Sequence, residues 1–366
     1  MNKKTTLLFG ALSLLVACSP KTTYKTPSGI NSLWADEVGY FSRAATVFEE
    51  DGTRYYIFER NQVKNDETVT FALKTATLQE GEVVYSKPEI ILEPSNNGWD
   101  RYIFSPSVVK GEFHKGDKTY RYLLAYGGRK TENDLANQVG IAYSEKITGP
   151  WIKHETPLIT YDPDVYGDEY GAGAPSLVSY DKKGKVRLFY AYAETNLTNE
   201  RIVDCDFSNL NDIKIDQGKR HISVHGLRDN ADNVILANAD FAIDPSGNLY
   251  CVRDVFPLSG NAPGFATSIQ VAVADVGILN DFISYEWEVL STYTTSMTVD
   301  YEDDDSLGWD EIYSAALVTD PYGHLAANQE KLIVIYSTAD EPEEREDTSY
   351  KWSAFLAYME VNIAHG

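Results

Sequence analysis

The sequence predicts an all-β protein, a five-bladed β-propeller of four-stranded antiparallel blades. Three observations predict this fold. Tyrosine is abundant, with 25 in 366 residues, and alternating runs such as "TRYYIFER" and "KVRLFYAYAE" are typical of half-buried strands. One strand–turn–strand unit recurs five times along the chain. No Pro/Ser-rich linker divides the interior, so a single closed domain accommodates all the units.

The repeat becomes visible when its five copies are aligned. Each copy has a small residue, an apolar strand, a turn rich in Asp, Gly or Lys, and a second strand rich in aromatic residues. The spacing leaves room for two more strands after each hairpin, as a four-stranded blade requires. Inner strands are crowded near the axis, which favours small residues at their starts. The copies start at Ser42, Ser105, Ala174, Ala239 and Ala315, with separations of 63, 69, 65 and 76 residues.

The last unit is the shortest, with 52 residues from Ala315 to Gly366. We therefore expect a strand from the stretch before Ser42 to complete the last blade and close the ring. The propeller domain then covers residues 30–366. A β-sandwich built from similar hairpins is the alternative.

The N-terminus has the pattern of a secretory signal. Lys3 and Lys4 precede an apolar run over residues 7–15, which is too short to cross a bilayer as a helix. The run leads into "LVAC" at Cys18, which resembles a bacterial lipoprotein lipobox and implies cleavage before Cys18 and acylation of its thiol. An ordinary secretory signal is the alternative. We expect a signal peptide over 1–17, the lipidated Cys18 and a polar tether over 18–29, and anchoring in the bacterial cell envelope, in the periplasm or at the cell surface.

The composition limits the partners of the protein. The net charge is −23, and it becomes −25 once Lys3 and Lys4 leave with the signal. Such a field repels nucleic acid and anionic lipid, and it favours neutral or cationic ligands. We expect a monomer. Cys205 and Cys251 remain in the mature chain, either as a disulfide or as two buried thiols.

Several phrases carry a family resemblance. They are "SPSVV" with "YRYLLAYGG", "APSLV" with "VRLFYAY", "VTDPYGHL" with "LIVIYST", and "IAYSEKITGPW" over 141–151. Together they resemble the five-bladed β-propeller glycosidases, the superfamily that holds glycoside hydrolase families 43, 32, 68 and 117. The resemblance implies that paired carboxylates in the axial funnel hydrolyse an O-glycosidic bond of an oligosaccharide.

The loops that enter the inner strands gather at one end of a propeller, and here they are rich in acids and aromatic residues. Carboxylates accept hydrogen bonds from vicinal hydroxyls, and aromatic rings pack on the apolar face of a sugar. The sequence therefore predicts a carbohydrate site at this end. The predicted substrate-binding residues are Trp34, Asp36, Arg43, Trp99, Asp100, Arg101, Asp168, Tyr170 and Trp309.

These residues also have a structural interpretation. Acids are common in exposed loops, and the Trp residues can be wedged between blades. Arg43 and Arg101 either pair with the acids or bind an acidic sugar. The phrase "GWD", at Gly98 and again at Gly308, records either a site or only the ancestry of the repeat.

The catalytic carboxylates of family 43 are missing at the matching positions. The resemblance places a base Asp, a second Asp and an acid Glu where this chain has Arg43, Ser107 and Gly173. Asp240 stands inside an inner strand and is the predicted base or orienting carboxylate. The predicted acid is a Glu, since its side chain reaches further beside the aromatic residues. The divergent catalytic set is thus Asp240, Glu169, Asp310 and Glu311.

Two other functions stay open. A propeller without the family carboxylates can bind a glycan without cutting it. A protein-interaction scaffold would instead present a large exposed apolar surface. No cofactor and no metal are predicted. Calcium is an alternative for the acidic stretch 300–311, which lacks the ligand order of an EF-hand, so a solvated loop is the preferred interpretation.

Overall fold

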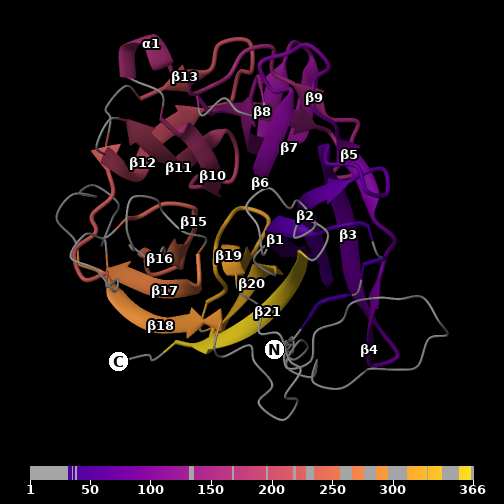
Figure 1. Cartoon of the computed structure of the whole chain (residues 1–366), viewed down its shortest axis with the longest axis vertical. Helices are drawn as coiled ribbons and strands as arrows, with labels where there is room; N and C mark the ends of the chain where they lie inside the picture. Colours follow the sequence, from indigo (N-terminus) through magenta and orange to yellow (C-terminus); the bar gives the residue numbers. More distant parts are fainter. Residues whose placement is uncertain are drawn as a thin grey trace.

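The chain forms five blades around a common axis (Figure 1). Three sheets are single blades, and an eight-stranded sheet joins two more, so the predicted fold class is confirmed. The computed structural model describes residues 32–34, 36–37, 39–131, 136–166, 169–194, 197–216, 220–227, 235–255, 266–275, 286–295, 311–327, 329–339 and 354–363.

Each blade runs from an inner strand at the axis to outer strands at the rim, with antiparallel neighbours. Blade 1 contains β1 (Arg43–Glu50), β2 (Thr53–Asn61), β3 (Val69–Gln79), β4 (Glu82–Tyr85) and β5 (Glu89–Leu92). Blade 2 contains β6 (Tyr102–Lys115), β7 (Lys118–Arg129), β8 (Gln138–Ser144) and β9 (Ile152–Lys153). A single helical turn, α1 (Pro163–Tyr166), precedes blade 3.

The remaining blades follow the same plan. Blade 3 contains β10 (Gly171–Ser179), β11 (Lys185–Glu194), β12 (Leu197–Asp206), β13 (Lys214–Ile215) and β14 (Arg220–His221). Blade 4 contains β15 (Ala239–Ile243), β16 (Asn248–Val255), β17 (Ser268–Asp275) and β18 (Glu288–Thr294). Blade 5 contains β19 (Glu311–Thr319), β20 (Lys331–Ala339) and β21 (Phe355–Asn362).

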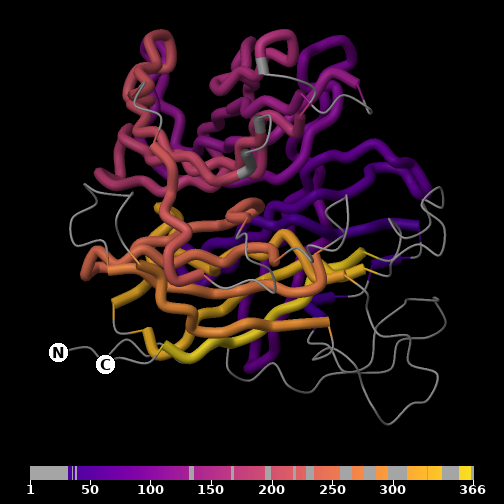
Figure 2. The backbone as a smooth tube through the Cα atoms, turned by 60° about the vertical axis from the view of Figure 1, so that its left-hand side comes forward, coloured from indigo at the N-terminus to yellow at the C-terminus, as the bar shows by residue number. Residues whose placement is uncertain are grey.

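The ring closes between the first and the last blade. β1 pairs in parallel with β19, so blades 1 and 5 form one continuous sheet. Ser32 forms an antiparallel bridge with Ala357 of β21, and the N–H of Leu33 donates to the carbonyl of Leu356 at 3.0 Å. The N-terminal segment therefore lies along the outer strand of blade 5, where the short last repeat needs a partner. In Figure 2 the indigo strands of blade 1 meet the orange and yellow strands of blade 5.

The inner strands share a backbone feature that explains their small residues. One non-glycine residue near each start has a left-handed φ between 44° and 50°. In four blades this residue lies at a bulge, where the register against the second strand shifts. Bulky and β-branched residues are strained at such a φ, so small residues and Asn suit the position. The five residues are Ala44, Ser105, Ala174, Asn238 and Ser314.

Side chains from three inner strands join neighbouring blades. In each of these strands the residue two positions after the left-handed residue has a side-chain oxygen. This oxygen accepts a backbone N–H from the inner strand of the next blade. Asp240 therefore occupies in blade 4 the position that a serine occupies in blades 2 and 3. The bonds are Leu177 N–H to Ser107 at 3.0 Å, Phe241 N–H to Ser176 at 3.0 Å, and Leu317 N–H to Asp240 at 2.9 Å.

Apolar clusters fill the spaces between blades and hold both cysteines. Cys205 lies in the cluster between blades 2 and 3, and Cys251 lies in the cluster between blades 3 and 4. Both are buried free thiols, so the disulfide alternative does not hold. Among the described residues, no helix has the length and hydropathy needed to span a membrane.

Ser176→Ala should destabilise the propeller more than Ser107→Ala. Ser176 accepts from Phe241 and also donates to Asp240 at 2.7 Å, whereas Ser107 accepts from Leu177. Each variant leaves a buried N–H unpaired, which costs about 1–3 kcal/mol, and Ser176→Ala additionally removes a donor from a buried carboxyl. Urea unfolding of the two variants checks the order. Equal losses would contradict the double role of Ser176.

Candidate functional site

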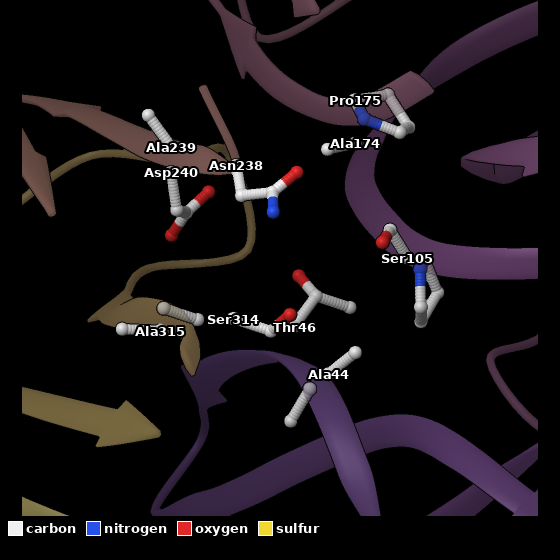
Figure 3. Close-up of a pocket in the computed structure, with 13 residues that line it drawn as sticks. Ala44, Thr46, Ser105, Ala174, Pro175, Asn238, Ala239, Asp240, Ser314 and Ala315 are labelled. Atoms are coloured by element: carbon white, nitrogen blue, oxygen red, sulfur yellow. The ribbon is translucent and has the colours of Figure 1, made fainter. Parts of the chain in front are cut away.

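A cavity lies on the axis where the five inner strands meet (Figure 3). Its open space, counted together with the solvent-filled mouth, is about 390 Å³. Every blade contributes to the lining, mostly with Ala and Pro from the starts of the inner strands. The polar side chains in the lining are Thr46, Ser105, Asn238, Asp240 and Ser314.

Asp240 is the one carboxyl group among the described residues that line this cavity. Its Oδ1 accepts a hydrogen bond from the Ser176 hydroxyl at 2.7 Å, and its Oδ2 accepts the N–H of Leu317 at 2.9 Å. Burial raises the pKa of Asp240 to about 6, although these hydrogen bonds act in the opposite direction. The group is therefore mostly ionised at pH 7 and becomes protonated as the pH falls below 6.

A second acid lies behind the cavity wall. Asp254 of β16 is 1% exposed, and it accepts the N–H of Ser314 at 2.8 Å and the Nδ2 of Asn238 at 3.2 Å. Burial raises its pKa to about 7, against the effect of these bonds and of Arg253. Asp254 thus holds two lining residues in place, and it is about half protonated at neutral pH.

Two further acids tie the starts of inner strands in a similar way. Glu59 of β2 accepts the N–H of Ser105 at 2.8 Å and the Nε–H of Arg43 at 2.7 Å, which makes an ion pair of Arg43 and Glu59. Glu200 of β12 is fully buried and accepts the N–H of Ala239 at 3.3 Å. Burial raises the pKa of Glu200 well above its ordinary value, which favours the neutral acid.

Tyr170 fills the space at Gly173, where the family 43 pattern would place its acid. A Cβ on Gly173 would lie 2.4 Å from the hydroxyl of Tyr170 and 3.0 Å from the ring of Phe104, so an acidic side chain does not fit there. Burial raises the pKa of Tyr170, helped by the charge of Glu200 and opposed by that of Arg129. The phenol therefore stays neutral and can donate a hydrogen bond at the rim of the cavity, between blades 2 and 3.

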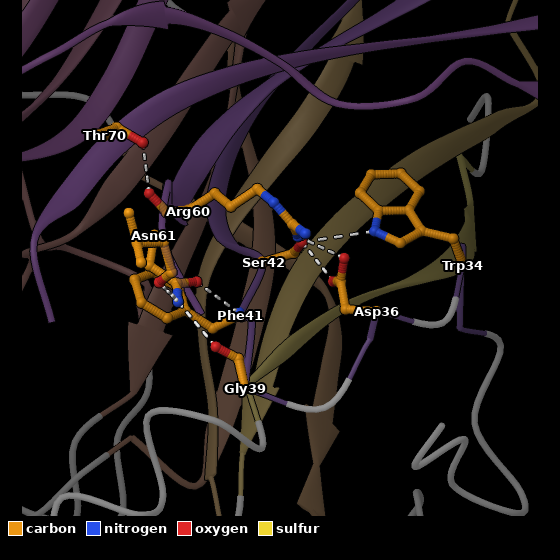
Figure 4. A network of polar contacts seen from close by, with 9 residues as sticks. Trp34, Asp36, Gly39, Phe41, Ser42, Arg60, Asn61 and Thr70 are labelled. Carbon is orange, nitrogen blue, oxygen red and sulfur yellow. Dashed lines mark hydrogen bonds and ion pairs between the residues drawn. The ribbon is translucent and has the colours of Figure 1, made fainter. Parts of the chain in front are cut away.

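Trp34 and Asp36 lie in a packed polar network of blade 1 (Figure 4). Arg60 and the hydroxyl of Ser42 each donate to Asp36 at 2.5 Å, and the indole N–H of Trp34 reaches the Ser42 oxygen at 3.4 Å. The Lys74 ammonium lies 4.2 Å from the Trp34 ring centroid. Neither predicted residue lines the cavity. Trp34 is therefore wedged between blades. Asp36 forms an ion pair that fixes a loop.

Trp99 and Asp100 are likewise built into blade 2. Trp99 stacks on Tyr126 with 5.8 Å between ring centroids, and it covers Gly140, where a Cβ would lie 2.4 Å from the indole. Asp100 is 2% exposed and accepts from Lys153 at 2.6 Å and from Tyr126 at 2.9 Å. Burial alone would raise the pKa of Asp100, but these donors lower it below its ordinary value. Trp99 and Asp100 of the first "GWD" phrase therefore contribute to the packing of blade 2.

The remaining predicted residues are scattered or lie outside the described part. Arg101 is exposed, Glu169 is half-buried beside Tyr170, and Glu311 is 2% exposed at the start of β19. None of these three lines the cavity. Within the described residues, no group of His, Cys, Asp and Glu is arranged to hold a metal ion. Outside the described residues lie Cys18, Asp168, Trp309 and Asp310, with the acidic stretch 300–310.

Sequence reasoning did not single out Glu59, Glu200 and Asp254. These acids lie on second and third strands, whereas the predicted site residues lie mainly in the loops that enter the inner strands. A signal was present in the phrases "YIFERN", "NERIV" and "CVRDV", where charged residues interrupt apolar strands. A charge in such a buried position needs a partner, and here the partner is the backbone of the next blade.

Fold and site together define a five-bladed β-propeller whose axial cavity is lined, among the described residues, by the carboxyl of Asp240. The sequence matches no family model and no curated protein. Solved structures of the same fold include the α-L-arabinofuranosidase of Podospora anserina in complex with cellotriose, at 11% identity, TM-score 0.51 and 92% coverage of both chains.

Two more solved structures have the same fold. The family 117 glycoside hydrolase of Zobellia galactanivorans aligns at 12% identity and TM-score 0.55 over 93% of this chain and 89% of the other. The GH43_1 enzyme of Xanthomonas citri, complexed with xylotriose, aligns at 10% identity and TM-score 0.56 over 90% of both chains. At these identities the similarity shows the fold, which is the fold that the resemblance implied.

Asp254→Asn should change how stability depends on pH. The folded-state pKa is raised to about 7, so the contribution of Asp254 to stability is present at low pH and is lost as the pH rises toward 7. The amide keeps an acceptor for Ser314 and does not titrate. We expect the unfolding free energy of the variant, relative to wild type, to increase by about 2–3 kcal/mol between pH 5 and pH 8. Urea unfolding with the exposed Asp117→Asn as control measures this difference, and a constant value would contradict the raised pKa.

The loss of stability caused by Gly173→Ala should depend on the side chain at Tyr170. The new methyl group collides with the Tyr170 hydroxyl, which lies 2.4 Å from the Cβ position, and overpacking of this kind costs about 1–3 kcal/mol. The same substitution in a Tyr170→Phe background meets one atom fewer and should cost less. A double-mutant cycle by thermal unfolding measures the coupling. Additive effects would mean that Tyr170 does not fill this space.

Proposed function

We propose that the protein is a glycoside hydrolase-like enzyme that binds an oligosaccharide at the mouth of the axial cavity and cuts an O-glycosidic bond with carboxyls unlike those of family 43. The observation that carries the proposal is Asp240, a carboxyl that lines the cavity and titrates near pH 6. Hydrolysis of this kind needs one ionised and one protonated carboxyl near neutral pH.

The described residues allow roles to be assigned. Asp240 acts as the base or orienting carboxylate, with Ser176 and Leu317 holding its two oxygens. Glu169 supplies the acid, because it is the half-buried entrance Glu beside the neutral Tyr170. Asp254 acts through Asn238, whose amide it holds at the cavity wall, and is thus a positioning residue.

The fold supports this proposal, because the structural neighbours include arabinofuranosidases and a family 117 glycoside hydrolase, and two of those described above are complexes with oligosaccharides. The N-terminal pattern adds a location. We place the enzyme in the bacterial cell envelope as a monomer, anchored by a lipid on Cys18, and without a metal or cofactor.

A non-catalytic glycan-binding propeller is the second candidate. It is favoured by the replacement of two family 43 carboxylates, where Arg43 pairs with Glu59 and Gly173 is covered by Tyr170. The same cavity then holds the sugar, and Asp240 only accepts hydrogen bonds from its hydroxyls.

Incubation of the protein, starting after Cys18, with a broad oligosaccharide panel separates these functions. Product mass and retention of intact glycan are both measured. We expect a product that Asp240→Asn abolishes and Glu169→Gln reduces at least a hundredfold, while the exposed entrance variant Glu37→Gln stays near wild type. The rate should fall as the pH drops below about 6, because Asp240 becomes protonated.

Other outcomes have clear meanings. Retention without any product would identify a binding protein. A product that survives Asp240→Asn would remove Asp240 from the mechanism. Neither product nor retention across the panel would contradict the carbohydrate function itself.

A further inference from the structure

Three polar atoms without a partner lie around Tyr170, on residues of blades 2 and 3. Arg129 Nε, Asn137 Oδ1 and Glu200 Oε2 are buried and have no hydrogen-bond partner in the described part of the chain. Arg129 and Glu200 both lie close enough to the Tyr170 phenol to influence its pKa. The Asn137 Nδ2 donates to the Tyr170 carbonyl at 2.8 Å. Buried polar atoms are nearly always hydrogen-bonded in native proteins, so a group of three at one rim indicates a place for a ligand.

The strand register brings two of these residues together. Gly128 of β7 pairs with Gln138 of β8, and Arg129 and Asn137 are the residues directly beyond this pair in the two segments. Arg129 is the last residue of β7, and its guanidinium carbon lies 6.0 Å from the centroid of the Tyr102 ring. A donor and an acceptor therefore stand side by side where the blade 2 hairpin opens toward the rim.

Arg129 carries the charge that this rim leaves unbalanced. Among the acids around Tyr170, Glu59 is already paired with Arg43 at 2.7 Å, and Asp254 is held by Asn238 and Ser314. Burial favours the neutral form of Glu200, so it does not offset a cation. Within the described residues Arg129 has no ion pair. A guanidinium in this situation favours a carboxylate, which it binds with two parallel N–H groups.

The rim also offers an apolar face for a sugar ring. Phe104 is partly exposed near the start of β6, next to the left-handed Ser105. Its ring covers Gly127 and Gly173, whose Cβ positions would lie 2.3 and 3.0 Å away. The ring is thus fixed in place by its packing beside Tyr170. Sugars stack on aromatic faces while their hydroxyls reach polar groups at the edge.

We propose that Arg129, with Asn137, Tyr170 and Phe104, forms a subsite between blades 2 and 3 that binds the carboxylate-bearing sugar of an acidic oligosaccharide. Arg129 holds the carboxylate, Tyr170 donates a second hydrogen bond, and Asn137 accepts from a ring hydroxyl. The proposal refines the proposed function by naming the substrate class. In this subsite one short-range cation selects the anion against the long-range repulsion of a chain of net charge −23.

Binding of matched ligands tests this subsite. The protein, starting after Cys18, is titrated calorimetrically with trisaccharides of galacturonic, glucuronic and mannuronic acid, and with the methyl ester of each, which removes the charge and keeps the ring. We expect at least one acid to bind ten times or more tighter than its ester, since a charge-assisted hydrogen bond is lost in the ester.

The variants tie that preference to one side chain. Arg129→Gln should abolish it, and Arg129→Lys should restore part of it, because a lysine keeps the charge but not the paired donors. Arg121→Gln, at an exposed arginine on the same strand, β7, is the matched control and should keep the full preference. A thermal melt of each variant establishes that it is folded.

The remaining outcomes overturn the subsite in distinguishable ways. Equal binding of acids and esters, or a preference that survives in folded Arg129→Gln, would refute the subsite and leave the carbohydrate function standing. Binding or cleavage of neutral oligosaccharides alone would do the same. No binding of any acidic or neutral glycan would overturn the subsite and the proposed function together.

Discussion

The crowding of five inner strands around one axis is the constraint on which the rest of the structure depends. Each strand starts with a residue in the left-handed region, and the turn leaves backbone N–H groups facing the neighbouring blade. Those groups are buried and need acceptors. The chain supplies acceptors from side chains: Ser107, Ser176 and Asp240 between inner strands, and Glu59, Glu200 and Asp254 from the strands behind them.

This solution also gives the site its chemistry. A serine would satisfy an N–H without titrating, whereas a buried acid satisfies it and becomes able to change its charge near neutral pH. Asp240 and Asp254, with pKa values of about 6 and 7, are such acids at one cavity. Removing a carboxyl therefore weakens the frame and the site at once, which is why variants that keep an acceptor, Asn or Gln, are informative and Ala variants are not.

Much of the fold was predictable from the sequence, because a propeller repeats its pattern of strand, turn and small residue five times. The closing of the ring by the N-terminal segment followed from the length of the last repeat. The site was harder to predict from the sequence. The composition of a sugar site is present in Trp34, Asp36, Trp99 and Asp100. In the fold, however, these residues pack against side chains that are distant in sequence, namely Arg60, Tyr126 and Lys153. The contact of Tyr170 with Gly173 depends on the path of one loop, which composition does not encode.

The central claim is that the acids that join the blades are also the titrating groups of the axial site. Carbon-13 NMR of protein labelled at the aspartate carboxyl carbons tests it most directly, with Asp240→Asn and Asp254→Asn used to assign the signals. The account predicts two aspartates with midpoints near pH 6 and pH 7, each missing from the corresponding variant. If every aspartate titrates below about pH 5, as an ordinary carboxyl does, the two acids serve the frame alone and the account of the site is wrong.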